Sequence, residues 1–284
     1  MLSLNIFSDL QAILRYDFMA HAFEAGTVVA IVAGVIGYFA VLRRSSFAAH
    51  ALSHVGFAGA AGAVLLGLSP IVGLLSFTVA GGMAIAALGR KATERDVQIG
   101  VVLAFTLGLG VLFISLYKGY ATEAYSLLFG EILGISIADV WVTLIAGTLL
   151  LVLVAIFYRR LLFNSLDEEV AEAKGISIFW LEMIFMILIA IATSIAVQVV
   201  GVLLIFALMV TPAAISLRIA KTPFHGMLIS LLIALFAVWF GLFISFYLSY
   251  PVSFFITTFT FMIYVIVRIA QSRNSRFIPS EEHY

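Results

Sequence analysis

Nine apolar stretches follow one another along this chain, and each is long enough to cross the ~30 Å of hydrocarbon in a lipid bilayer. They lie at residues 18–42, 47–68, 70–89, 97–117, 137–158, 177–198, 200–219, 224–247 and 251–269. Hydrophobic residues make up 64% of the chain and charged residues 11%, whereas a soluble domain is about half apolar and about a quarter charged. The sequence therefore predicts an all-α, polytopic transmembrane helix bundle of about nine spans.

Three pairs of neighbouring stretches are separated by very short connections, at Ser69-Pro70, Val199-Val200 and Ser249-Tyr250. We expect tight helical hairpins at these places. The count would be eight if one of these hairpins were a re-entrant segment.

The positive charges indicate the orientation of the chain. With nine spans and the N-terminus outside, Arg15 and Lys118 are the only Lys or Arg residues of the whole sequence in outer segments. Positive residues collect in cytoplasmic loops of membrane proteins. The sequence therefore predicts an N-terminus outside and a C-terminus in the cytoplasm. The inner positive residues are Arg43, Arg44, Arg90, Lys91, Arg95, Arg159, Arg160, Lys174, Arg218, Lys221, Arg268, Arg273 and Arg276.

Several classes of function are excluded by what the sequence lacks. The formal net charge is zero, so nothing favours a nucleic-acid partner. Cysteine is absent, so any metal must be held by histidine, carboxylate or backbone oxygen. There is no GxxxxGK[ST] phosphate loop and no catalytic Ser/His/Asp set. We predict a transport protein without enzymatic activity, for which ATP, if it is used, is hydrolysed by a separate chain.

The chain divides into a membrane domain and short flanking segments. Residues 1–16 have one apolar helical face and are predicted to lie in the interface, with no cleavable signal. Residues 17–270 form the transmembrane domain, and residues 271–284 a cytoplasmic tail. The stretch 118–136 is too short to cross the membrane, so we expect it to lie on, or dip into, the outer face.

An inner segment, NSLDEEVAEAKG at residues 164–175, has the features of a short, capped helix at 165–175. Ser165 and Glu168 have the spacing of a capping box, and Asp167 and Glu169 add acids to the first turn. Gly175 suits the left-handed position that ends a helix. A permease driven by an outside ATPase needs such a coupling element, and a simple amphipathic linker is the alternative.

The second apolar stretch contains FAAHALSHVGFAGAAGA, in which His50 and His54 are four residues apart. Side chains at this spacing lie on the same face of a helix. Two imidazoles on one face can bind a divalent cation, and ionisable groups inside membrane spans are often functional. We therefore expect a metal path along this helix. In the alternative interpretation each ring bonds a neighbouring carbonyl and holds helices together.

The first stretch adds His21 and Glu24, which are three residues apart and near its outer end. With the second stretch, they make three imidazoles and one carboxylate in two adjacent helices, a set that zinc or manganese would accept. The alternative is that both groups lie in the headgroup layer. His225 and His283 fall in an inner loop and the tail, where solvation is the better interpretation.

The seventh stretch contains Pro212, preceded by Thr211, and begins near Gly201. Proline removes a backbone hydrogen bond and kinks a helix. A kinked helix can move as a gate, although many static spans also contain proline. We expect Gly201 and Pro212 to mark a gate or kink.

Several ordered blocks resemble the membrane subunit of zinc/manganese ABC importers. The blocks are Arg43-Arg44 followed by FAAHALSHVGFAG, then ERDVQIG, LLFGEILGIS, LDEEVAEAKGI and GVLLIFALMVTPAA. The resemblance covers most of the chain. It implies a permease dimer in a bacterial inner membrane. It also implies two ATPase subunits docked at the short inner helix, and an extracytoplasmic metal-binding protein that delivers Zn²⁺ or Mn²⁺ as cargo, with no permanent cofactor.

Residue by residue, His54 matches the family histidine and His50 stands where many members have aspartate. A His–His pair is a softer site, which favours zinc over manganese. Many members also have Asp-x-Pro-x-Gly near the last hairpin. In this chain Ser249, Pro251 and Ser253 occupy those places, so the acid and the glycine are lost.

Three alternatives remain open from the sequence. An ABC permease for a metal chelate, such as a siderophore or cobalamin, would not need paired histidines. A gradient-driven secondary transporter would bury His and Glu but would not need a coupling helix. A membrane sensor or scaffold would need more surface than these short inner loops present.

Overall fold

The computed structural model describes residues 13, 15–88, 92–117, 130, 132–166, 171–172, 174–175, 177–248 and 250–275, with the side chains of 92–95, 203 and 273–275 left out. Within these residues the chain forms nine helices and no strand. They are α2 (Asp17–Leu42), α3 (Ser46–Leu65), α4 (Pro70–Leu88), α5 (Ala92–Leu116), α7 (Ile137–Leu166), α9 (Ile178–Val200), α10 (Val202–Ile219), α11 (Pro223–Leu248) and α12 (Val252–Ser275).

Each described helix overlaps one of the nine predicted stretches. Eight of them are long and apolar enough to cross a membrane, and the ninth, α10, is an apolar helix of 18 residues. In lipid a spanning segment must satisfy its backbone hydrogen bonds internally, which a helix does. The predicted all-α polytopic bundle is confirmed.

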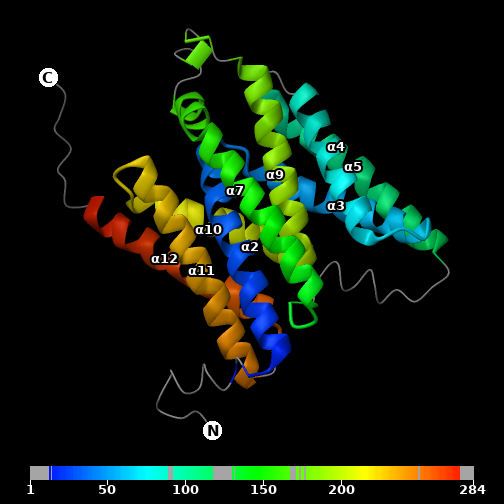
Figure 1. Cartoon of the computed structure of the whole chain (residues 1–284). Coiled ribbons are helices and arrows are strands. Elements are labelled where there is room, and N and C mark those ends of the chain that lie inside the picture. The colour runs from blue at the N-terminus through cyan, green and yellow to red at the C-terminus, as the bar shows by residue number, and fades with distance from the viewer. Residues whose placement is uncertain are drawn as a thin grey trace, which may run out of the picture.

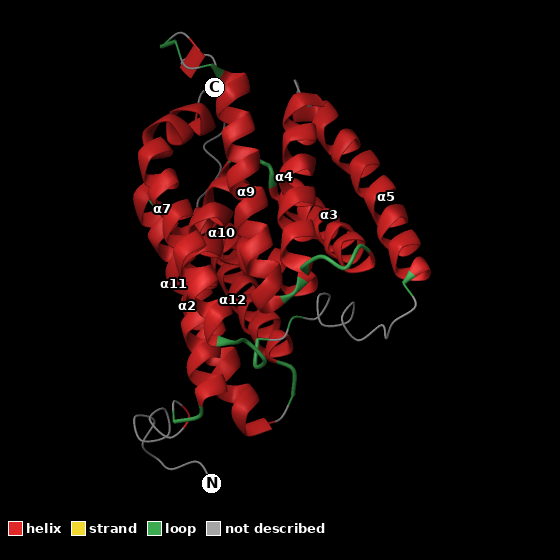
Figure 2. Ribbon diagram, turned by 45° about the vertical axis from the view of Figure 1, so that its right-hand side comes forward, coloured by secondary structure: helices red, strands yellow, loops and turns green. Residues whose placement is uncertain are grey.

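The helices form two groups with α9 between them (Figure 1). One group consists of α3, α4 and α5, in which α3 packs against both of the others. The other group has α2 at its centre, in contact with α7, α10 and α11, while α12 packs on α10 and α11. In Figure 2, α5 is the outermost helix of the first group. Helix α9 contacts α4 on one side and α2 and α7 on the other.

Helix α2 packs so closely that backbones touch. From Val32 to Ala40 every residue is buried. A Cβ atom added at Gly34 would meet the backbone of Leu231 in α11, and one added at Gly37 would meet the carbonyl of Met209 in α10. Small residues at helix interfaces permit this approach in lipid, where van der Waals packing supplies much of the attraction.

Buried hydroxyls add a few polar ties between the helices. The Ser230 hydroxyl donates to the Gly34 carbonyl at 2.8 Å and joins α11 to α2. The hydroxyls of Thr78 and Ser194 are 2.6 Å apart and join α4 to α9. Such bonds fix which faces of apolar helices meet.

The predicted break near Val199-Val200 is found one residue later. Gly201 is the single residue between α9 and α10, with φ 82° and ψ 164°. This backbone region is almost restricted to glycine. Gly130, with φ 75°, lies directly against the backbone of Val200 and Gly201. Gly130 therefore contacts the joint between the two helices.

The predicted inner end of the fifth stretch is wrong. Helix α7 does not stop near residue 158 but continues to Leu166, because the positive pair Arg159-Arg160 is followed by apolar residues that prolong the helix. Ser165 lies inside its last turn, where its hydroxyl donates to the Leu161 carbonyl at 2.5 Å. Ser165 is therefore not the N-cap of a new helix.

The end of the predicted coupling helix fits the structure. Gly175 has φ 77°, the left-handed conformation expected of it, and its N–H donates to the Glu172 carbonyl at 2.8 Å. Asp167, Glu168 and Glu169 lie outside the described residues. The coupling helix therefore stays a prediction, as do the divisions at 1–16 and 271–284 and the position of segment 118–136.

The close approach at Gly37 generates a test of the packing. In Gly37→Ala the added methyl group must push α10 away from α2, so we expect a destabilisation of about 1–3 kcal/mol. Thermal unfolding of the purified protein in detergent measures it. Gly108→Ala in α5 is the matched control, because nothing lies within 4 Å of the added Cβ there. Equal melting temperatures for the two variants would contradict the packing argument.

Candidate functional site

The histidine pair is partly exposed within a buried stretch of α3. Between Ala48 and Ala63 of α3, a range that the structure describes completely, every residue except His50 and His54 is buried. The two side chains are half-buried, with ring centroids 4.8 Å apart and ring planes nearly perpendicular at 87°. The predicted placement on one face is confirmed.

The neighbour of this pair across the bundle is Phe206 of α10. Its ring centroid lies 4.9 Å from that of His50, at an interplanar angle of 63°. Phe206 follows the Gly201 joint by little more than one helical turn. The histidine pair therefore faces the helix that was expected to act as a gate.

The pair can offer ring nitrogens to one ion. Within the part of the chain that the structure describes, the buried Nδ1 atom of His50 has no hydrogen-bond partner. Zinc and similar ions bind imidazole nitrogen at about 2.0–2.1 Å and prefer four ligands. Two imidazoles supply only part of such a set, so the remaining ligands must come from water or from another source.

The structure does not bring His21 and Glu24 to this pair. Both lie near the start of α2, and about 30 Å of helix separates His21 from the end of α2 that leads to α3. Among the described residues, no three His, Asp or Glu side chains gather closely enough to hold a metal ion. The expectation of one combined set from the two helices is therefore wrong, because the residues lie at different levels of the bundle.

Glu24 instead lines a groove between α2 and α7. The groove has a volume of about 500 Å³ and is otherwise apolar apart from Thr27. Thr27 is already bonded, since its hydroxyl donates to the Phe23 carbonyl at 2.6 Å and accepts from the Trp239 indole at 2.9 Å. Glu24 is exposed and His21 is half-buried. A metal role for these two residues stays a prediction.

The expected gate residues lie at the start and in the middle of α10. Gly201 precedes the helix, and Pro212 lies inside it and is buried. Gln198, just before the joint, donates to the Asp139 carboxylate of α7 at 3.0 Å. That contact holds the start of α7 and the end of α9 together, beside the joint.

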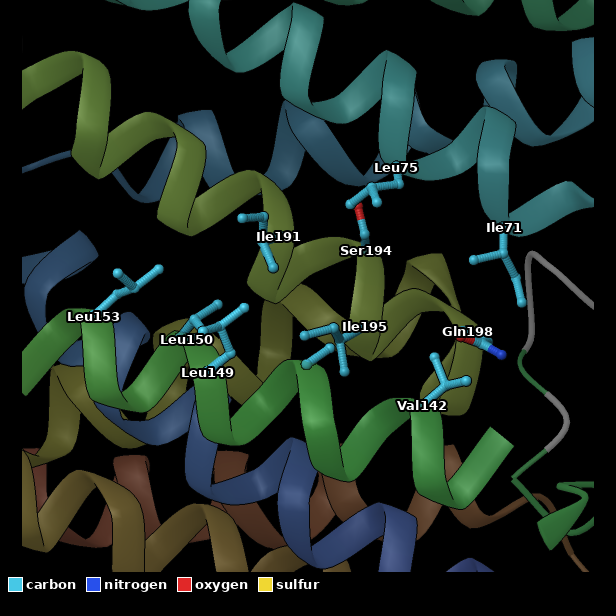
Figure 3. Close-up of a pocket in the computed structure, with 11 residues that line it drawn as sticks. Ile71, Leu75, Val142, Leu149, Leu150, Leu153, Ile191, Ser194, Ile195 and Gln198 are labelled. Carbon is cyan, nitrogen blue, oxygen red and sulfur yellow. The ribbon is translucent and has the colours of Figure 1, made fainter. Parts of the chain in front are cut away.

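A second groove, between α4, α7 and α9, does not offer a metal site. It has a volume of about 250 Å³ and is lined mainly by apolar side chains (Figure 3). Its two polar residues are Ser194 and Gln198, and both are already bonded within the protein. The groove suits lipid acyl chains better than an ion. The lining residues are Ile71, Leu75, Val142, Ala146, Leu149, Leu150, Leu153, Ile191, Ser194, Ile195 and Gln198.

The sequence analysis missed a buried ion pair. Arg43, at the end of α2, binds Glu182 of α9, and their side chains are only 4% and 7% exposed. Glu182 is an acid inside an apolar stretch, which is a recognisable signal of a functional or paired group. Phe206 gave no comparable signal, because a phenylalanine in a membrane span is ordinary.

His225 behaves as a surface residue. Its ring Nδ1 lies 2.6 Å from the Thr222 hydroxyl at the start of α11, and the pair is exposed. The interpretation as a solvated residue fits this position. His283 lies outside the described residues.

Comparison with known families identifies the class of protein. The family ABC-3, described as the ABC 3 transport family, matches residues 15–271. The chain therefore belongs to this family. Together with the eight span-length helices, this makes it a multi-pass protein of the bacterial plasma membrane and a membrane subunit of the ABC transport type.

Characterised relatives cover most of the chain. It is 35% identical over 206 residues to the manganese transport system membrane protein MntC of Listeria innocua, which covers 72% of this chain and 73% of that protein. It is 32% identical over 214 residues to the manganese import system permease protein ScaB of Streptococcus gordonii, with 75% and 77% covered.

Solved structures share the fold. PsaBC from Streptococcus pneumoniae, in complex with Fab, matches 93% of this chain and 95% of that chain, with a TM-score of 0.82 and 29% identity. A metal-chelate type ABC transporter in an inward-facing conformation matches with a TM-score of 0.66 at 16% identity. The second likeness concerns the fold alone.

The backbone at Gly201 generates a second test. An alanine there would hold a conformation that L-residues avoid, so Gly201→Ala should destabilise the protein by about 1–3 kcal/mol. Differential scanning fluorimetry of the purified variant measures the effect. Gly100→Ala, at a helical glycine with no atom within 4 Å of the added Cβ, should keep the melting temperature of the wild type. An undiminished melting temperature for Gly201→Ala would refute the strained joint.

Proposed function

We propose that this chain is the membrane subunit of an ABC importer for divalent metal ions, with zinc and manganese as the two candidate ions. One observation carries the proposal: His50 and His54 form a half-buried pair in a helix stretch, Ala48 to Ala63, that is otherwise buried, in a chain of an ABC transport family. The ion is cargo, and it passes between transient ligands of which these imidazoles are two.

The relatives support a metal ion over other cargo. The names of the MntC and ScaB proteins concern manganese transport, and both cover more than two thirds of the chain. The metal-chelate alternative has weaker support, since the chelate-type neighbour shares only 16% identity. Membership of an ABC family also disfavours a gradient-driven secondary transporter.

Two arguments favour different ions. Imidazole pairs suit zinc, whereas manganese prefers oxygen ligands. The relatives' names point to manganese. In this chain Ser249 stands where many members of the resembled family have the aspartate of Asp-x-Pro-x-Gly, so that acid is lost and the histidine pair remains as the softer ligand set of the path.

Weak binding is part of the mechanism. Conduction requires a site that is favourable enough to enter and loose enough to leave. A pair of imidazoles without a third protein ligand from the described residues meets this requirement. Movement of α10 about Gly201 and Pro212 would carry the Phe206 ring away from His50. A metal ion bound to the histidine pair could then leave for the next ligands along the path.

The orientation follows from the positive residues. With the N-terminus outside, the turns after α2 and α10 and the inner end of α7 face the cytoplasm and carry Arg43, Arg44, Arg159, Arg160, Arg218 and Lys221. The C-terminal tail then lies in the cytoplasm as well.

The partners follow from the family resemblance. In the proposed assembly, two copies of the chain enclose the path and two ATPase subunits dock at segment 165–175. An extracytoplasmic metal-binding protein delivers the ion, and membrane lipid surrounds the dimer. The stroke of the ATPases moves α7 and α9, between which the docking segment lies.

His54→Ala should abolish metal uptake, because one imidazole alone cannot bridge an ion between steps. Accumulation of zinc and manganese is measured in metal-starved cells that express the chain with its ATPase. His225→Ala, which removes an exposed histidine bonded only locally to Thr222, is the control and should transport as the wild type does. Wild-type uptake by His54→Ala, at an equal amount of protein in the membrane, would refute the assignment.

The choice of ion has its own expected outcome. Cells with and without the chain are compared under zinc limitation and then under manganese limitation. If the histidine pair sets the selectivity, His50→Asp should shift the preference towards manganese, because carboxylate is the harder ligand. An unchanged zinc-to-manganese ratio would show that selectivity resides elsewhere.

A further inference from the structure

Arg43 is the centre of a buried polar cluster, which we call the Arg43 cluster: Arg43, Asn164, Glu182 and Phe185. The Arg43 guanidinium forms an ion pair with the Glu182 carboxylate. With its amide oxygen turned towards Arg43, Asn164 accepts from both terminal nitrogens, at 2.9 and 2.8 Å. The guanidinium carbon also lies 4.7 Å from the centroid of the Phe185 ring.

The cluster joins the end of α2 to two helices much later in the sequence. Arg43 is the first residue after α2, Asn164 lies in the last turn of α7, and Glu182 lies in the first turns of α9. The segment between α7 and α9 is the docking site for the ATPase in the proposed function. Both helices that flank this segment are therefore bonded to the same guanidinium.

The turn after α2 leads to the metal path without a flexible linker. Its backbone is closed by two hydrogen bonds, from Arg44 N–H to the Val41 carbonyl at 3.1 Å and from Ser45 N–H to the Ala40 carbonyl at 2.7 Å. Arg44 holds the left-handed conformation at φ 56°. This pattern is the Schellman motif, which ends one helix in a fixed geometry. Helix α3 begins at the next residue, Ser46.

His50 lies about one helical turn into α3. A displacement of Arg43 is thus carried through a closed turn to the first histidine of the pair. Along this route the structure has rigid elements and side-chain contacts, which is the arrangement that can transmit movement between distant sites.

Stability alone does not require this cluster. Removing two charges from water is expensive, and buried ion pairs can often be replaced by apolar residues without loss of stability. What an arginine supplies instead is geometry, since its planar fork binds a carboxylate and an amide in fixed directions.

We propose that Arg43 is a positioning residue that couples the ATPase docking segment to the histidine pair. Movement of α7 and α9 during the ATPase cycle is passed through Glu182 and Asn164 to Arg43, and through the closed turn to α3. This inference rests on the proposed function, because it requires an ATPase at segment 165–175 and an ion at His50 and His54.

The test compares ions moved per ATP hydrolysed in proteoliposomes that contain the complete transporter. In Arg43→Met with Glu182→Met, the apolar pair keeps the helices packed, so we expect a near-native melting temperature and continuing ATP hydrolysis. The number of ions moved per ATP should fall about fivefold to tenfold. Arg43→Lys keeps the positive charge but lacks the planar guanidinium group, so the number of ions moved per ATP should fall less than in the Met–Met variant.

The matched control is another buried polar pair, which joins α4 to α9. Thr78→Val with Ser194→Ala removes the 2.6 Å contact between α4 and α9, which does not touch the turn after α2. This variant should keep the wild-type ratio of ions to ATP. A ratio that falls equally in both double variants would mean that any lost polar tie disturbs transport, and would overturn the specific role of Arg43.

Two further outcomes are decisive. A wild-type ratio in the Met–Met variant would show that the cluster is only structural. If that variant does not fold, Asn164→Leu decides, because it leaves the ion pair in place: a reduced ratio supports coupling and an unchanged ratio overturns it. Failure of the proposed function is distinguishable, since the wild-type transporter itself would then move neither zinc nor manganese.

Discussion

The bundle depends on the close approach of α2 to α10 and α11. In lipid, apolar side chains gain nothing from being moved out of the solvent, so helices associate through van der Waals contact and a few hydrogen bonds. Gly34 and Gly37 remove the side chains that would hold the backbones apart, and the Ser230 hydroxyl then reaches the Gly34 carbonyl. This central packing fixes α10, and α10 in turn places Phe206 against His50.

The second group of helices is attached to this centre mainly through α9. The contact between Thr78 and Ser194 sets how α4 meets α9, and the Arg43 cluster sets how α9 meets the turn between α2 and α3. Because α3 begins directly after that turn, the position of the histidine pair depends on both groups. A site that lies between two packed groups can change when the groups move relative to each other, which suits a transporter.

The chemistry of the pair fits passage better than storage. A permanent metal site closes the coordination sphere with several protein ligands. Here two half-buried imidazoles stand beside an aromatic ring, and no third acidic or imidazole ligand is near them among the described residues. An ion held in this way remains exchangeable. Selectivity between zinc and manganese then depends on small differences in ligand softness.

The sequence by itself determined the membrane bundle, the approximate limits of the described helices, the pairing of His50 with His54 and the family. These features depend on local hydropathy and on residues within one helical turn or one motif. They can therefore be predicted from residues that are close together in the sequence. The separation of His21 and Glu24 from that pair was decided only by the tertiary structure, because it depends on the levels that two helices reach in the bundle. The same is true of the Arg43 cluster, in which Arg43 is more than a hundred residues from the other three members, and of Phe206, whose role comes from the helix it faces. The extension of α7 through Ser165 also could not be predicted from the sequence. A serine before acidic residues can either cap the start of a new helix or donate to a carbonyl in the preceding turn of its own helix, as Ser165 does.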